Sequence, residues 1–475
     1  METLPKNIIT FIKKRLDERF VFILIVLFLF LRLYKLEQTF VYGLDEEYLA
    51  LYAQTILKDF HIIWIGVSAA NVGYYLGPGL VYLTAIFLGI GKSNPLVLGY
   101  AATGMSLLGF FALMFVSKEL FGKRAAFFTS ALYLFSPFAI FYDHKYWPVL
   151  LPFVCIMLYY SIVRLYKNPR YIFAISFFIA AGYHLHLTLW IFWPIIFFAL
   201  WQNRKKIRWI HWIVSGGIFL AITSPLLVFD IIHNFDNILM PLRLVQNLSE
   251  GPTHTNHLWL FVETSSKMWI VKSATQNVIL SIILALTTIC AFVTAGFSSK
   301  NKKSFQLLSI ISLIFTASFI FYPGPMQEYY ATFLLPFWAL ATGIFLSRLH
   351  KLTALILLSF FIGVNTYSFL YHQPTSDYRN KIEIVKRASA IVDGEEYYLN
   401  FDEPYHSFGG FRSLFALQGQ TPAQSTADGM FGWLYGNEIS SNTPTRKVTI
   451  SRNSHLDIKP LIEQFTVGKF TVYIE

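Results

Sequence analysis

The stretch FVFILIVLFLFLRLYKLEQTFVYGLDEEY, residues 20–48, joins a long apolar run to a cluster of three carboxylates. Its first part, residues 20–37, is close to the roughly 20 residues that one helix needs to cross the hydrocarbon of a bilayer. No small-residue cleavage site follows this run and further apolar runs do, so we interpret it as a retained membrane helix and not as a signal peptide. The stretch therefore predicts a membrane protein whose first span leads directly into acidic residues.

The composition of the whole chain points the same way. Apolar residues make up 55% and charged residues 14% of the 475 positions, and the mean hydropathy is +0.50, which a soluble domain could not keep from water. The net charge of +11 comes from short clusters between apolar runs, so we assign it to membrane topology and expect no nucleic-acid partner. Cys155 and Cys290 both lie in apolar runs, which leaves neither a disulfide framework nor a four-ligand zinc site.

Eleven apolar runs predict membrane-spanning helices, at residues 20–37, 97–117, 124–141, 148–166, 170–185, 187–202, 208–229, 276–297, 304–321, 329–347 and 351–371. Residues 74–90 are also apolar, but Gly77, Pro78 and Gly79 interrupt their start. If this segment does not cross, every basic cluster falls on one side of the membrane: 13–15, 118–124, 164–170, 204–208, 300–303 and 348–351. We therefore predict eleven spans, a cytoplasmic N-terminus, an outward-facing or re-entrant segment at 74–90, and an outer C-terminus.

The predicted domains follow from this topology. Residues 1–371 form a membrane module, with a first outer loop at 38–96 that carries juxtamembrane helices and a long outer loop at 230–275. Residues 372–475 are mixed and polar, with strand-like pieces at Glu396–Asn400, Lys447–Ile450 and Lys469–Ile474. The predicted fold is mainly α, a multi-pass protein of the cell membrane with a small extracytoplasmic α/β domain at its C-terminal end.

Three carboxylates, Asp45, Glu46 and Glu47, open the first outer loop. The amphipathic pattern at Leu49–Leu57 places them at a helix N-terminus, where acids can simply complement the helix dipole. Their position directly after a span favours a functional role, because ionisable residues at the membrane are functional candidates.

A further acid, Asp143, lies in the sequence FYDHKYWP at residues 141–148. This is a predicted outer turn between two spans, where charge pairing with His144 and Lys145 is the simplest interpretation. Together with Asp45 it would place two carboxylates at one membrane surface, an arrangement suited to general-base chemistry.

Two histidines and two tyrosines lie at other outer span ends. His184 and His186, in GYHLHL at 182–187, are either satisfied interfacial histidines or contacts for a phosphate, and two ligands without a near third are a weak signal for metal. Tyr329 and Tyr330, in QEYYATFLLP at 327–336, are either aromatic-belt anchors or site residues. The sequence contains no Walker loop, dinucleotide fingerprint or HExxH motif that would support other chemistry.

Taken together, these motifs resemble the GT-C superfamily of glycosyltransferases, specifically relatives of protein O-mannosyltransferases and of the lipid A aminoarabinose transferase. The resemblance covers residues 20–371 and is weak over the C-terminal domain. It rests on Asp45-Glu46 with Tyr48, on Asp143 after Leu134-Phe135-Ser136-Pro137, and on Tyr330 with Leu334-Leu335-Pro336.

The resemblance implies transfer of a sugar from a polyprenyl-phosphate donor to a lipid, glycan or protein acceptor at the outer face of the membrane, normally with inversion. Asp45 would be the general base, and Glu46 and Asp143 would orient the acceptor or the base. The residues expected to bind the substrate or the donor phosphate are Tyr48, Lys145, His184, His186, Tyr329 and Tyr330. We expect no required cofactor, and a divalent metal would need a ligand set that the sequence does not show.

One position departs from the family pattern. Relatives often carry Arg or His directly before the late tyrosine, where this chain has Glu328-Tyr329-Tyr330. Basic residues of the long outer loop could then bind the phosphate: Arg243, Lys267 and Lys272. This loop, which also carries His254, His257 and Trp259, is long enough to form a lid.

A multi-pass secondary transporter of a small solute or lipid is the main alternative. Transporters commonly show internal repeats and broken helices near mid-membrane, whereas no half of this sequence repeats and the acids cluster at one surface. A non-catalytic scaffold whose outer domain binds a ligand is a third interpretation. The sequence leaves the sugar, the acceptor and the oligomeric state open.

Overall fold

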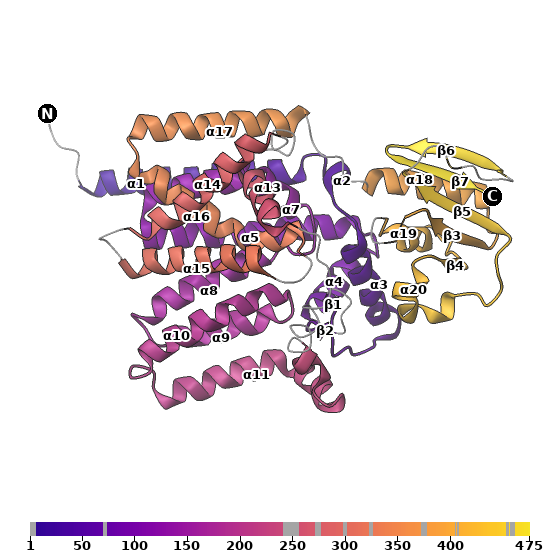
Figure 1. The fold of residues 1–475 in the computed structure, drawn as a ribbon, viewed down its shortest axis with the longest axis horizontal. Helices are drawn as coiled ribbons and strands as arrows, with labels where there is room; N and C mark the ends of the chain where they lie inside the picture. The colour runs from indigo at the N-terminus through magenta and orange to yellow at the C-terminus, as the bar shows by residue number, and fades with distance from the viewer. Residues whose placement is uncertain are drawn as a thin grey trace.

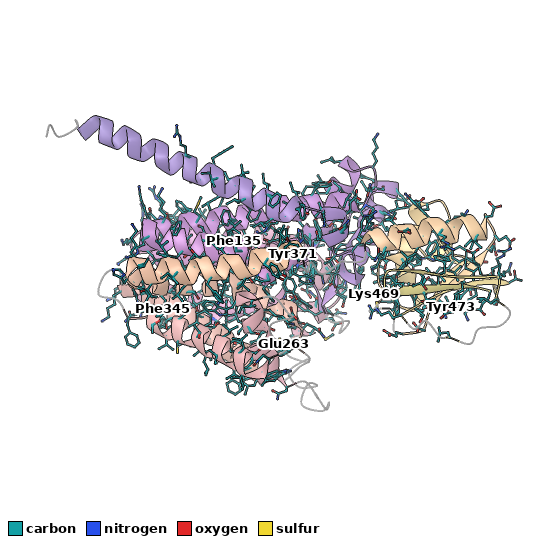
Figure 2. All side chains as sticks on the ribbon, turned by 90° about the horizontal axis from the view of Figure 1, so that it is seen from above. Phe135, Glu263, Phe345, Tyr371, Lys469 and Tyr473 are labelled. Carbon is teal, nitrogen blue, oxygen red and sulfur yellow. The ribbon has the colours of Figure 1, made fainter. Side chains whose placement is uncertain are left out.

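The computed structural model describes residues 6–69, 74–240, 256–270, 277–297, 302–322, 326–371, 378–403, 405, 408–452, 456 and 461–475. A helical bundle occupies one side of the molecule and a small α/β domain the other (Figure 1). Figure 2 shows the same division from above, with Phe135 and Phe345 in the bundle and Lys469 and Tyr473 in the α/β domain.

Each predicted apolar run is helical. The long helices are α1 (Lys6–Leu33), α5 (Leu96–Phe121), α6 (Lys123–Phe135), α8 (Leu151–Leu165), α9 (Tyr171–Gly182), α10 (Phe192–Asn203), α11 (Trp209–Ile232), α14 (Val278–Ala295), α15 (Lys302–Phe321), α16 (Leu335–Arg348) and α17 (Lys351–Tyr371). Among the described residues, five helices are long and apolar enough to cross a membrane, or six if one bent pair counts as a single span. Five shorter apolar helices accompany them, and the count of eleven spans stays a prediction.

Several predicted runs are not one continuous α-helix, and two of their breaks lie close to the motifs at residues 141–148 and 327–336. The run at 124–141 breaks at Ser136, where α6 gives way to α7 (Pro137–Asp143) with a bend of 63°. Proline cannot extend the preceding helix, and the Ser136 hydroxyl caps the new one at the amide of Ala139. The run at 329–347 likewise begins as a 3-10 helix, η3 (Glu328–Phe333), before α16. Both breaks lie at the end of the bundle that faces the C-terminal domain.

The basic clusters gather at the opposite end of the bundle. Lys206 donates to the carbonyl of Tyr166 at 3.2 Å, and the ammonium of Lys303 lies 3.4 Å from the Tyr166 ring centroid. Arg124 donates to the carbonyl of Leu349 at 2.7 Å. Turns that are far apart in sequence therefore share one end, as the predicted topology requires.

A layer of short elements covers the other end of the bundle. It contains α2 (Leu36–Thr39), α3 (Leu44–Asp59), the strand pair β1 (Ser68–Ala69) and β2 (Tyr74–Tyr75), and α4 (Gly79–Ile90), which packs on α3. The 12 residues of α4 rise only about 18 Å, well short of the roughly 30 Å hydrocarbon core. Because α9 and α10 are equally short, this length does not separate α4 from the predicted spans, and the prediction that residues 74–90 do not cross stays a prediction. α13 (His257–Trp269) lies at the same end (Figure 1).

The C-terminal domain is built on a five-stranded mixed sheet of order β4-β3-β5-β7-β6. Its strands are β3 (Tyr397–Phe401), β4 (Gln424–Ser425), β5 (Arg446–Ser451), β6 (Glu463–Val467) and β7 (Phe470–Ile474), and its main helices are α18 (Tyr378–Val392) and α19 (Phe411–Leu417). β3 runs parallel to β4 and β5, whereas β7 is antiparallel to β5 and β6. The three predicted strand pieces are confirmed as β3, β5 and β7.

Glu47 fixes this domain to the outer layer. Its fully buried carboxylate accepts hydrogen bonds from the amides of Gly410 (2.5 Å) and Ser413 (2.9 Å) and from the hydroxyl of Tyr405. Lys381 adds a bond of 2.8 Å to the carbonyl of Tyr42. A buried carboxylate is tolerated only where donors satisfy it, so these contacts define one relative position of the domain.

Candidate active site

The turn between α7 and α8 carries the sequence that the motif analysis singled out at residues 141–148. This turn lies against the segment that links α2 to α3, because the amide of Val41 donates to the carbonyl of His144 at 3.1 Å and Val41 bridges Lys145 in parallel register. A residue from the first outer loop and a residue more than a hundred positions later thereby become neighbours.

The side chains at this junction form an ion pair. The ammonium of Lys145 donates to Oδ2 of Asp45 at 3.0 Å, with 41% of the Asp45 side chain and 17% of the Lys145 side chain exposed. Burial alone would lower the pKa of Lys145, but the carboxylates of Asp45 and Glu46 raise it. Lys145 is therefore protonated at neutral pH, and Asp45 is an accessible carboxylate at the outer end of the bundle.

Glu46 lies beside this pair and is fully buried. Its two oxygens accept hydrogen bonds from the amide of Gly43 at 3.1 Å and from the amide of Trp147 at 3.2 Å. Burial raises the pKa of Glu46 to about 7, with a further increase from Asp45, while Lys145 and the two amides oppose the shift. The carboxylate thus joins the first turn of α3 to the turn that carries Lys145.

His186 and two tyrosines complete the group, which we call the outer cluster: Asp45, Glu46, Lys145, His186, Tyr329 and Tyr330. The His186 ring centroid lies 5.7 Å from that of Tyr329 and 5.0 Å from that of Tyr330. The ammonium of Lys145 lies 5.6 Å from the Tyr329 ring centroid. The histidine and both tyrosines thus gather around the ion pair.

The protonation state of His186 follows from its contacts. Burial lowers the pKa of His186 to about 4, so the ring is neutral at pH 7. Its Nδ1 accepts from the amide of Thr188 at 3.1 Å, which assigns the remaining proton to Nε2. The outer cluster therefore holds a carboxylate that can accept a proton, together with an ammonium and an N–H group that can bind an anion.

Asp143 belongs to a neighbouring buried network and not to the ion pair of Asp45. Its carboxylate lies 2.9 Å from a guanidinium nitrogen of Arg32, which is fully buried near the end of α1, and accepts a long bond of 3.4 Å from the hydroxyl of Tyr133. His144 accompanies it, with Nε2 at 2.6 Å from the carbonyl of Arg32. These contacts anchor the start of the α7–α8 turn to the first span.

Two predicted site residues lie elsewhere. Both ring nitrogens of His184 are engaged, with Nδ1 accepting from the amide of Gly79 at 3.0 Å and Nε2 2.9 Å from the carbonyl of Ile222. His184 thus holds the start of α4 against α11. Tyr48 packs on the C-terminal domain, with its ring centroid 5.1 Å from that of Phe431.

Of the three basic residues predicted in the long outer loop as phosphate ligands, the structure describes only Lys267. Lys267, in α13, pairs with the carboxylates of Glu263 at 2.7 Å and Glu328 at 2.5 Å. Glu328, the residue at which this chain departs from the family pattern, is therefore charge-compensated by Lys267. Arg243, Lys272 and His254 lie outside the described residues, as do the parts of the predicted lid at 241–255 and 271–275.

Sequence reasoning missed Arg32 and Trp147. Arg32 is a single cation at the end of an apolar run. Placing a charge in the membrane interior is costly, so an arginine at this position is a candidate for a buried partner, and this was the only signal in the sequence. Trp147 contributes a backbone amide to Glu46, which no side-chain pattern reveals. Among the residues that the structure describes, no group of three or more His, Cys, Asp or Glu could hold a metal ion.

A family model supports the resemblance drawn from the motifs. Residues 76–229 match the model of the dolichyl-phosphate-mannose-protein mannosyltransferases. The matched segment includes the α7–α8 turn and both histidines of residues 182–187. No curated protein matches the chain.

Solved structures match over most of the chain. The structure of ArnT from Cupriavidus metallidurans bound to undecaprenyl phosphate has 13% sequence identity and a TM-score of 0.62, over 96% of this chain and 98% of that one. The oligosaccharyltransferase AglB from Archaeoglobus fulgidus, in complex with an inhibitory peptide and a dolichol-phosphate, has 14% identity and a TM-score of 0.52, over 92% of this chain and 69% of that one. The predicted resemblance to protein O-mannosyltransferases and the aminoarabinose transferase is confirmed, and the chain has the GT-C fold of a multi-pass membrane protein.

Proposed function

We propose that this protein is a membrane glycosyltransferase that moves a sugar from a polyprenyl-phosphate donor to an acceptor at the outer face of the membrane, with Asp45 as the general base. The observation that carries the proposal is the partly exposed ion pair of Asp45 and Lys145, which shares contacts to the Tyr329 ring with the neutral ring of His186. The fold supports the donor class, since ArnT is bound to undecaprenyl phosphate and AglB to a dolichol-phosphate.

The reaction assigns one role to each side of the ion pair. The acceptor hydroxyl gives its proton to Asp45 as its oxygen bonds to the anomeric carbon of the sugar. The bond from that carbon to the phosphate oxygen breaks with inversion, and the polyprenyl phosphate leaves with the electron pair. Lys145 and the Nε2–H group of His186 stabilise the charge on the leaving phosphate, and the nearby hydroxyl of Tyr330 adds a donor.

An exchange of partners by Lys145 links donor binding to base activity. Without donor, the ammonium of Lys145 occupies Oδ2 of Asp45, the atom that would take the acceptor proton. A donor phosphate offers Lys145 a second anion, and the ammonium then shifts toward it. Oδ2 of Asp45 is therefore free to accept the proton of the acceptor hydroxyl only when the donor is in place.

Glu46 and Asp143 position this pair and do not themselves touch the reacting atoms. Glu46 holds Gly43 and Trp147, which bracket Asp45 and Lys145 in sequence. Asp143 fixes the start of the same turn to Arg32. In this proposal both residues orient the base, as predicted, by fixing the backbone segments that carry Asp45 and Lys145.

The membrane orientation and domain division complete the proposal. The basic end of the bundle faces the cytoplasm, and the end that carries the outer cluster faces outward. The C-terminal domain, predicted at 372–475, then lies outside the cell membrane, and Tyr48 contacts it through Phe431. The membrane module at 1–371 carries the chemistry.

The test is a donor panel. Purified protein is incubated with a set of polyprenyl-phosphate sugars and candidate acceptors, and the released polyprenyl phosphate is measured by mass spectrometry. Wild type is expected to release it from at least one donor, and Asp45→Asn to lose about 10²-fold or more of the rate. Asp59→Asn, which changes an exposed carboxylate at the far end of the same helix, is the matched control. Equal rates in wild type and Asp45→Asn would reject Asp45 as the base.

A further inference from the structure

A second charged site lies away from the outer cluster, where the membrane module meets the C-terminal domain. It is a groove of about 420 Å³ whose lining includes Glu37 of α2, Lys92 and Leu96 around the start of α5, and Arg379, Ile382 and Lys386 of α18. None of these residues belongs to the outer cluster. The groove therefore needs a separate explanation.

The charge in the groove is unbalanced. Lys92, Arg379 and Lys386 contribute three cations, and all three side chains are exposed. Among the described residues, no ion pair or hydrogen bond engages any of these three side chains, and Glu37 is the single carboxylate of the lining. Three like charges around one cavity repel each other, so an anion in the groove would stabilise the junction.

The groove has a fixed framework. The hydroxyl of Tyr378 donates to Oδ1 of Asn94 at 3.2 Å, and the amide of Leu96 donates to the same oxygen at 3.0 Å. The Tyr378 ring packs against Phe40 and Tyr42, with centroids 5.4 Å and 6.0 Å apart. The two parts of the chain thus meet through defined contacts, and the cations surround a shape that exists before any ligand binds.

The position of the groove indicates the kind of anion. Leu96 begins α5, one of the helices long and apolar enough to cross a membrane, and Glu37 follows α1 directly. The groove therefore lies at the depth where that span leaves the hydrocarbon. Its lining combines cations with Leu96, Ile382, Leu414 and Leu417, which suits an amphiphile whose phosphate meets the cations and whose glycerol and first methylenes meet the leucines.

We propose that this groove binds the phosphate of an anionic membrane lipid, and that the bound head group bridges the membrane module to the C-terminal domain. A free phosphate ion would satisfy the cations equally but would leave the apolar lining uncovered. The lipid head group uses both parts of the surface. This site does not depend on the proposed transferase activity, since no residue of the groove takes part in that reaction.

The test is lipid-dependent thermal unfolding of the full-length protein in detergent. Short-chain phosphatidylglycerol is titrated against wild type, with short-chain phosphatidylcholine and inorganic phosphate as separate arms. Phosphatidylglycerol is expected to raise the unfolding temperature at lower concentration than either. The combined variant Lys92→Gln, Arg379→Gln and Lys386→Gln should weaken the apparent affinity by about fivefold for each cation removed. Glu37→Gln, which removes the one acid, should strengthen it.

A control variant separates the groove from general surface charge. Lys205→Gln, Arg208→Gln and Lys351→Gln remove three exposed cations at the other end of the bundle and should leave the titration unchanged. If the combined groove variant does not fold, the three single variants replace it, each with a loss of about fivefold. An unchanged titration in the groove variants, or an equal loss in the control, would overturn the site. An equal effect of inorganic phosphate and phosphatidylglycerol would overturn the lipid assignment.

Discussion

Removing Arg32 tests how the turn that carries Lys145 is held. Arg32 is fully buried and supplies the charged partner of Asp143, whose side chain is 3% exposed. Arg32→Met leaves a buried carboxylate with one long hydrogen bond from Tyr133, and breaking a buried pair in this way costs about 3–5 kcal/mol. We expect a large loss of stability and, in any protein that folds, loss of transfer, because the turn is no longer fixed.

The reverse change should cost less. Asp143→Asn leaves Arg32 with the carbonyl of Leu134 at 2.7 Å and with the Phe28 ring, whose centroid lies 4.3 Å from the guanidinium carbon. Arg32 therefore keeps partners that Asp143 does not have. The predicted order of stability is wild type, then Asp143→Asn, then Arg32→Met.

The assay is a double-mutant cycle on the full-length protein in detergent micelles, with unfolding followed by circular dichroism. The double variant Arg32→Met with Asp143→Asn should be more stable than Arg32→Met alone, since the buried charge is gone, with a coupling energy of about 2–3 kcal/mol. Additive losses would refute the reasoning, as would equal stability of Arg32→Met and Asp143→Asn.

Three further changes probe other parts of the account. Burial raises the pKa of Glu46 from 4.5 to about 7, so the stability that this shift contributes is full below pH 4.5 and is lost as the pH rises to about 7. Glu46→Gln should flatten the unfolding free energy between pH 4.5 and 7, and an unchanged pH slope would contradict the shift. Glu47→Ala leaves the buried amides of Gly410 and Ser413 without an acceptor at the domain junction. Limited proteolysis should therefore release the C-terminal domain faster than in wild type. Equal rates would argue against a junction held by this carboxylate. A Cβ at Gly77 would collide with the ring of His184, whereas one at Gly104 meets nothing within 4 Å. Gly77→Ala should therefore lower the unfolding temperature by several degrees, and Gly104→Ala should not. Equal unfolding temperatures would mean that His184 does not pack closely on this segment.

Much of the fold could be predicted from local pattern. The apolar runs became helices because a run of that length has no alternative in a bilayer, where every backbone group must bond within its own segment. Strands β3, β5 and β7 followed from short apolar and aromatic pieces in a polar context. β6 was missed because Glu463–Val467 carries only two buried apolar side chains, and its identity as a strand depends on pairing with β7.

The site was predictable in its residue types but not in its contacts. Asp45 and Lys145 were both singled out from their positions at outer ends of spans, yet nothing in the sequence pairs residues a hundred positions apart. Asp45 and Asp143 were predicted at one membrane surface, and in the structure the carboxylate of Asp143 faces Arg32, whereas that of Asp45 faces Lys145. His184 was grouped with His186 by spacing alone. In the structure its ring reaches the other way, toward α4 and α11.

The central claim is that Lys145 exchanges Asp45 for the phosphate of the donor. Native mass spectrometry of polyprenyl phosphate binding to wild type, Asp45→Asn and Lys145→Met tests it without any need to know the sugar or the acceptor. We predict that Lys145→Met binds about tenfold or more weakly, while Asp45→Asn binds at least as tightly as wild type because its lysine is no longer held by a carboxylate. Wild-type affinity in Lys145→Met, or loss of binding in Asp45→Asn, would contradict the account.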